Sequence, residues 1–304
     1  MTRFFCLECK GIGLLVCSTG SEPITAVGFS ADGWFVYAGN KLGQLVRIAA
    51  DGSTEPGMPV SHDLGIVHSI RARPETNEIY ACGTRRLVQF HHDSPQKWTV
   101  IYPLQNEQFT ALAFLSSAIK ITGTGDPNSA RAGFLMLENL VKNRPLESSI
   151  PEKGGVRTVE VYPAHQTVAW ATGDRQICGW DTTKPDRVRM SFQQNCNALA
   201  FSPDGSVLAA AMEWNTFLIE WKKKRERYIL KGHKGRVTSL AYQSNGTLLT
   251  ASWDGIVRFW DGNGLEFHSL EFQQGRLTSL AIAPDGSRAV VGTDRGCVVI
   301  WDLQ

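Results

Sequence analysis

The chain has 304 residues, a formal net charge of +2 and 20% charged residues, a near-neutral balance that does not require nucleic acid or an anionic membrane as a partner. No apolar run reaches the roughly 18 residues of a membrane-spanning helix. Its seven cysteines, an odd number, are scattered mostly through apolar strand-like runs, which predicts reduced core thiols rather than a disulfide framework. We therefore expect a cytoplasmic protein.

Residues 1–23 form an N-terminal segment ahead of the first repeat. Glu8 and Lys10 interrupt its apolar stretch and no small-residue cleavage site follows, so it is not predicted to be a secretory signal. Residues 14–18 have the composition of a strand, whereas residues 4–9 fit either an additional strand or a partly ordered arm. Cys6 and Cys9 have half of a zinc-site spacing, but the second half is missing and no metal is expected.

Seven similar segments follow in chain order, at steps of 40 to 47 residues. Each joins a short apolar strand, a tight turn and a second apolar strand. The copies are VGFSADG from Val27, IRARPET from Ile70, LAFLSSA from Leu112, VEVYPAH from Val159, LAFSPDG from Leu199, LAYQSNG from Leu240 and LAIAPDG from Leu280. This period predicts one all-β domain over residues 1–304, a seven-bladed β-propeller of four-stranded antiparallel blades.

The sixth copy, residues 232–261, shows the strand order most clearly. Residues 237–242, 248–252 and 256–260 are expected strands, separated by an Asn-Gly turn and an Asp-Gly turn. The preceding charge run, residues 222–227, falls between a third strand and an outer strand, where a solvated turn is expected in preference to a site for an anionic partner.

This copy resembles the WD40-repeat family. The resemblance is carried by Gly232-His233 ahead of the first strand and by the closing Trp260-Asp261, and Trp-Asp recurs at residues 180–181 and 301–302. It covers about residues 14–304 and implies blades around a central channel that serve as an interaction platform without chemistry of their own. It also implies a structural hydrogen-bonded tetrad within this blade, formed by His233, Thr250, Asp254 and Trp260.

The other copies depart from the family pattern and are expected to depend on packing. Trp170 occupies the hydroxyl position of the fourth copy, and Ile48 and His91 replace the closing Trp of the first two. The seventh copy reaches its third strand at residues 297–302, with only two residues after it. An uncovered strand edge is a pairing hazard, so residues 14–18 are predicted to add the outer strand and close the ring.

Two kinds of loop position are expected to open towards one face of the propeller. The start of the first strand carries Arg157, Asn195, Asn197, Arg236, Arg276, Gln108 and His68, and the end of the second carries Trp214, Trp253 and Asp294. Trp and Arg are enriched at interface hot spots. We predict that Trp214, Trp253, Arg236 and Arg276 form one contiguous partner-binding patch, to which Arg157, Asn197 and Asp294 add. The alternative is that both tryptophans pack between blades.

Catalytic signatures such as a phosphate loop, His-Glu-x-x-His or a nucleophile elbow are not found in the sequence. The favoured function is a non-catalytic scaffold, monomeric by itself, that binds a protein or peptide with its loop rim and channel mouth. No cofactor, nucleic acid or membrane is expected. The alternatives are a propeller enzyme with a channel site and a sensor of an anionic small ligand, the latter suggested by Arg157, Arg236 and Arg276.

Overall fold

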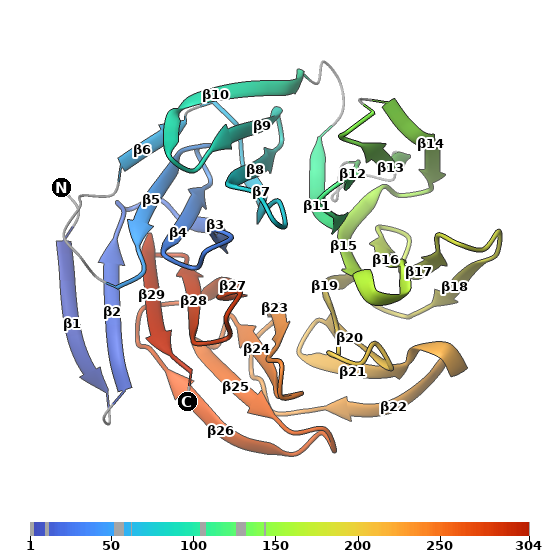
Figure 1. The fold of residues 1–304 in the computed structure, drawn as a ribbon. Helices are drawn as coiled ribbons and strands as arrows, with labels where there is room; N and C mark the ends of the chain where they lie inside the picture. The colour runs from blue at the N-terminus through green and yellow to red at the C-terminus, as the bar shows by residue number, and fades with distance from the viewer. Residues whose placement is uncertain are drawn as a thin grey trace.

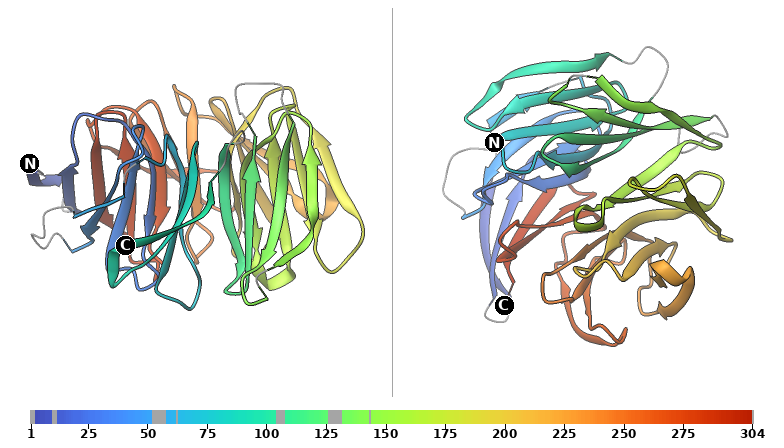
Figure 2. Two further views of the ribbon diagram at one scale, coloured as in Figure 1. Left: turned by 90° about the horizontal axis from the view of Figure 1, so that it is seen from above. Right: turned by 45° about the vertical axis from the view of Figure 1, so that its right-hand side comes forward.

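Seven antiparallel sheets are arranged radially around a central axis in the computed structural model (Figure 1). The structure describes residues 3–9, 12–51, 58–61, 63–103, 108–125, 132–142 and 144–303. Within these ranges the helical turns are η1 (Pro163–His165) and η2 (Trp221–Lys223). The predicted seven-bladed β-propeller is confirmed. The strands run through the thickness of the ring, so the loops collect on two opposite faces (Figure 2, left).

Blades 1 to 6 each contain four strands, which follow one another from the channel outwards. Blade 1 is β3 (Ile24–Phe29), β4 (Phe35–Asn40), β5 (Leu45–Ala49) and β6 (Met58–Ser61). Blade 2 is β7 (Val67–Ala72), β8 (Glu78–Gly83), β9 (Arg86–His91) and β10 (Ser94–Pro103). Blade 3 is β11 (Phe109–Ser116), β12 (Ile119–Thr124), β13 (Gly133–Asn139) and β14 (Arg144–Glu152).

The next three blades repeat this order. Blade 4 is β15 (Val156–Tyr162), β16 (Thr167–Thr172), β17 (Gln176–Asp181) and β18 (Arg187–Ser191). Blade 5 is β19 (Cys196–Phe201), β20 (Val207–Met212), β21 (Asn215–Glu220) and β22 (Arg225–Leu230). Blade 6 is β23 (Val237–Tyr242), β24 (Leu248–Ser252), β25 (Ile256–Trp260) and β26 (Glu266–Glu271).

Blade 7 joins the two ends of the chain. Its first three strands are β27 (Leu277–Ile282), β28 (Arg288–Thr293) and β29 (Cys297–Asp302), followed outwards by β2 (Ile12–Ser18) and β1 (Arg3–Cys9). β2 pairs antiparallel with β29, with Leu14 opposite Trp301 and Ser18 opposite Cys297 (Figure 1). The predicted ring closure by an N-terminal strand is therefore confirmed. β1 is the additional-strand alternative, and it makes this sheet five-stranded.

Seven hydrophobic clusters of described residues fill the seven boundaries between adjacent blades. β2 contributes to two of them because successive side chains of a strand point to opposite faces. Val16 packs in the cluster between blades 6 and 7, and Cys17 packs in the cluster between blades 7 and 1. The closing strand thus seals both boundaries of blade 7. Packing between blades also explains why blades without the tetrad can still hold the ring together.

Blade 4 has a buried polar network of its own around Trp170. The Trp170 indole N–H donates to Oε1 of Glu152 at 2.9 Å, and Glu152 is fully buried. The Arg189 guanidinium contacts both carboxylate oxygens of Glu152 at 3.1 Å. A buried carboxylate is tolerated when it is paired and hydrogen-bonded. A glutamate at the end of β14 in blade 3 therefore satisfies the tryptophan that occupies the hydroxyl position of blade 4.

Candidate binding site on the rim and in the channel

Every innermost strand has a β-bulge after its first paired residue. In β15, Val156 pairs with Thr172 and Thr158 pairs with Ala171, so the ladder skips Arg157. A bulge leaves its extra residue unpaired and redirects its side chain. The seven bulged residues, which we call the bulge ring, are Thr25, His68, Thr110, Arg157, Asn197, Thr238 and Thr278.

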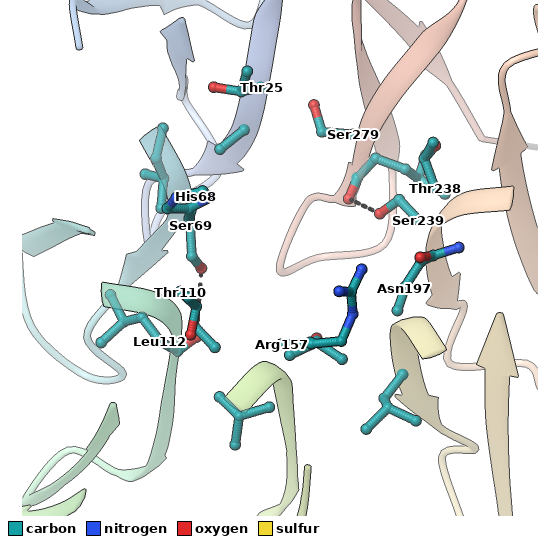
Figure 3. Close-up of a pocket in the computed structure, with 18 of the residues that line it drawn as sticks. Thr25, His68, Ser69, Thr110, Leu112, Arg157, Asn197, Thr238, Ser239 and Ser279 are labelled. Carbon is teal, nitrogen blue, oxygen red and sulfur yellow. Dashed lines mark hydrogen bonds between the residues drawn. The ribbon is translucent and has the colours of Figure 1, made fainter. Parts of the chain in front are cut away.

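All seven members of the bulge ring line one cavity of about 160 Å³ at the centre of the propeller (Figure 3). Several of them also bond across a blade boundary. The Thr238 hydroxyl donates to the Leu277 carbonyl at 3.0 Å, and the Asn197 amide donates to the Val237 carbonyl at 3.3 Å. The bulge ring therefore links neighbouring blades while it presents polar groups to the channel.

Arg157 is the arginine of the bulge ring. Its Nε donates to the Cys196 carbonyl of blade 5 at 3.3 Å, and its guanidinium is directed into the cavity (Figure 3). Burial holds the pKa of Arg157 below its ordinary value, and the charge of Arg236 acts in the same direction while Glu213 opposes it. The charges of Arg236 and Glu213 on the rim therefore act on Arg157, although its side chain lies in the channel.

Two further ionisable residues of the channel differ in their surroundings. Burial lowers the pKa of His68 to about 4, so its imidazole is neutral at pH 7. Among the described residues, its buried Nε2 has no hydrogen-bond partner. Glu160, three residues beyond Arg157 on β15, lines the same cavity. Burial raises the pKa of Glu160, and the charge of Arg71 partly offsets this.

Trp253 lies on the rim, in the turn between β24 and β25. It is 40% exposed. The guanidinium carbon of Arg236 is 4.9 Å from the centroid of the Trp253 ring, and that of Arg276 is 5.3 Å away. Both distances are typical of cation–π contacts. Blades 6 and 7 thus bring these three side chains together on the surface, not between blades.

Two carboxylates flank this group. Oδ1 of Asp294 accepts a hydrogen bond from the Arg276 backbone N–H at 2.9 Å, and Arg236 lies 3.5 Å from Oε1 of Glu213. Trp214, which follows Glu213 in the turn between β20 and β21, is 61% exposed. It therefore neighbours the blade 5–6 boundary. We call Trp214, Arg236, Trp253, Arg276 and Asp294 the rim patch.

The turn that carries Trp253 is held from inside the blade by a chain of hydrogen bonds. His233 Nδ1 is 2.9 Å from Oδ2 of Asp254, and His233 Nε2 is 2.7 Å from the Thr250 hydroxyl. The Trp260 indole N–H donates to the same hydroxyl at 2.9 Å. Burial alone would raise the pKa of Asp254, but hydrogen bonds from His233 and backbone N–H groups lower it to about 2. The four side chains satisfy one another and anchor the rim.

The structure separates the predicted site residues into two groups. Trp214, Trp253, Arg236, Arg276 and Asp294 lie on the rim, whereas Arg157 and Asn197 lie in the channel. Sequence reasoning missed the four threonines of the bulge ring, Thr25, Thr110, Thr238 and Thr278. A signal for them exists, because each bulged residue stands two positions ahead of the start of its repeat copy.

Metal-ligand clusters and membrane-spanning helices are both absent from the described part of the chain. There, no group of three or more His, Cys, Asp or Glu residues could hold a metal ion, and no helix is long and apolar enough to cross a membrane. The side chains of Cys6 and Cys9, the half zinc spacing, lie outside the described residues. Five cysteines that are described, Cys17, Cys82, Cys178, Cys196 and Cys297, are free thiols.

Fold and site together define a seven-bladed β-propeller with an aromatic and cationic patch on one face and a narrow polar channel. Comparison with known proteins finds two repeats of a known family. Residues 224–261 and 265–302 match the model of the WD domain, G-beta repeat. The chain therefore carries WD40 repeats, and the resemblance to the WD40-repeat family is confirmed.

Several curated proteins align with part of the chain. The Periodic tryptophan protein 2 homolog of Schizosaccharomyces pombe is 32% identical over 128 residues, covering 40% of this chain and 14% of that protein. Autophagy-related protein 16 of Arabidopsis thaliana is 31% identical over 145 residues, 45% of this chain and 28% of that protein. Target of rapamycin complex subunit wat1 of S. pombe, by its name a subunit of a complex, is 26% identical over 152 residues, 48% of each. The chain spans less than half of each relative.

Proposed function

We propose that this protein is a non-catalytic scaffold that binds a protein or peptide segment on the rim patch. The main support is the exposed aromatic ring of Trp253, which Arg236 and Arg276 contact from two blades. Large aromatic and guanidinium groups form most interface hot spots, and an already ordered anchor loses little conformational entropy on binding. The tetrad beneath Trp253 supports this pre-ordering.

Related proteins add support for a binding role. One aligned relative is a complex subunit by name, and another, from Gallus gallus, is named p21-activated protein kinase-interacting protein 1-like. We also propose that residues 1–304 act as one domain that is monomeric by itself and resides in the cytoplasm. The pairing of β2 with β29 supports one domain, and the five free thiols support a reducing compartment.

The experiment is a quantitative pull-down with the full chain as bait, followed by affinity measurement with the partner it captures. The double variant Trp253→Ala with Arg236→Ala should weaken binding by about 2 kcal/mol or more while leaving the melting midpoint nearly unchanged. Trp34→Ala is the matched control. Trp34 is 59% exposed in the turn between β3 and β4, on the opposite face from Trp253. Normal binding by the double variant would place the partner site elsewhere.

A further inference from the structure

The hydrogen bonds of the bulge ring do not use all of its polar groups. Four members bond across a blade boundary: Thr110, Arg157, Asn197 and Thr238. Two buried polar atoms of the ring, Nε2 of His68 and Oγ1 of Thr278, have no partner among the described residues. Buried polar atoms in native proteins are usually hydrogen-bonded, and an exception points to water or a ligand. Both atoms belong to residues that line the channel cavity.

The charge of this cavity is asymmetric along the channel. Its lining contains Arg71, Arg157 and Glu160. Arg71 and Glu160 also line a second cavity together with Phe29, at the far end of β3 from Thr25. Arg157 therefore supplies the fixed charge at the level of the bulge ring. Its guanidinium is directed into the cavity, where an anion would offset the effect of burial (Figure 3).

We propose that the bulge ring binds one carboxylate group. Arg157 supplies the charge and a planar fork that matches a carboxylate, and His68 and Thr278 add hydrogen bonds directly or through water. The lining carries two arginines and one glutamate, so a single negative charge balances it, whereas a dianion such as phosphate would exceed it. A volume of about 160 Å³ is also small beside the ~300 Å³ at which ligand pockets usually begin.

The carboxylate has two possible sources. One is a small free acid. The other is an acidic side chain of a protein segment lying on the rim patch, a source that rests on the proposed function. The rim and the channel mouth adjoin, because the side-chain amide of Asn197 in the bulge ring donates to the carbonyl of Val237, the residue that follows Arg236. Binding of a free carboxylate needs no protein partner. Experiments can therefore refute the carboxylate site and the rim site independently of each other.

The test is an NMR titration of the ¹⁵N-labelled full chain with acetate, with glutarate, and with the blocked tripeptides acetyl-Gly-Glu-Gly-amide and acetyl-Gly-Gln-Gly-amide. We expect saturable shifts at bulge-ring amides with at least one carboxylate probe and none with the Gln peptide. Response to the acids alone identifies a free acid as the source, and response to the Glu peptide identifies a side chain. The absence of a saturable shift with every carboxylate probe would overturn the proposal.

Variants make this test specific. Arg157→Gln should weaken binding by about tenfold or more, because the charge and the fork are both lost. Arg175→Gln is the matched control, since Arg175 is an exposed arginine of the same blade and is not part of the cavity lining. If Arg157→Gln does not fold, Arg157→Lys, which keeps the charge without the fork, should weaken binding severalfold. Equal affinity of wild type and the folded Arg157 variant would refute the site. Trp253→Ala should bind acetate like wild type.

Discussion

Nδ1 of His233 lies 2.9 Å from Oδ2 of Asp254, and this contact joins the loop before β23 to the turn that follows β24. Asp254 also accepts a hydrogen bond from the backbone N–H of Lys234 at 2.9 Å, so one carboxylate fixes both segments. Trp253 immediately precedes Asp254. The interior of blade 6 therefore determines the position of the exposed ring at the centre of the rim patch.

Asp254→Ala should lower the free energy of unfolding by about 1–3 kcal/mol, because it strands the His233 imidazole and two backbone donors. Denaturant titration measures the change. Asp302→Ala, an exposed aspartate at the end of β29, is the control and should shift the midpoint little. An unchanged midpoint for Asp254→Ala would mean that the tetrad contributes nothing to stability.

Glu152→Ala should destabilise the fold by about 2–3 kcal/mol, since the Trp170 indole N–H loses its acceptor inside blade 4. Arg189→Ala should also destabilise the fold, because it leaves the fully buried Glu152 carboxylate without its charged partner. Thermal and denaturant unfolding of both variants test these losses. A Glu152→Ala variant as stable as wild type would contradict the proposed acceptor role of Glu152.

Stability should depend on pH through His68. Burial lowers its pKa from 6.5 to about 4. Between pH 4 and pH 6.5 the unfolded chain therefore binds more protons than the folded chain. The contribution of neutral His68 to the free energy of unfolding is complete above about pH 6.5 and is lost as the pH falls towards 4. His68→Thr installs the residue found at four other positions of the bulge ring and removes this titration.

The measurement is the free energy of unfolding of wild type and His68→Thr between pH 7.5 and pH 4. The wild-type value minus the variant value should fall with decreasing pH, by at most about 3 kcal/mol. The difference isolates His68 from the carboxylates that titrate over the same range. A difference that is constant with pH would show that His68 is not a buried neutral imidazole.

Deletion of residues 1–19 should cause aggregation or lower the melting midpoint by about 10 °C or more. It removes β2, exposes the edge of β29, and takes Val16 and Cys17 from two clusters. Deletion of residues 1–11 is the control, because it removes β1 and leaves β2 (Ile12–Ser18) in place. A 1–19 deletion that stays monomeric and melts like the full chain would argue against closure by β2.

The repeat period determined the number of blades, because each copy forms a sheet whose two faces can be buried only against similar neighbours. The unmatched third strand of the seventh copy and the apolar residues 14–18 were sufficient to predict closure, which joins Leu14 to Trp301. The spacing of His233, Thr250, Asp254 and Trp260 was also visible, because it is set within one repeat and depends on local strand geometry.

Only the tertiary structure decided what depends on pairing between distant strands. The acceptor for the Trp170 indole N–H is Glu152, at the end of the outer strand of the preceding blade. The spacing of the two residues in the sequence does not identify this partner. Arg157 and Arg236 were both predicted to flank the start of a first strand, yet Arg157 is the bulged residue of β15 and lies in the channel, whereas Arg236 precedes β23 and lies on the rim. The physical reason is that the bulge turns the side chain of the skipped residue, Arg157 in β15 and Thr238 in β23, towards the channel. Which residue is skipped is decided only when the neighbouring strand pairs with it.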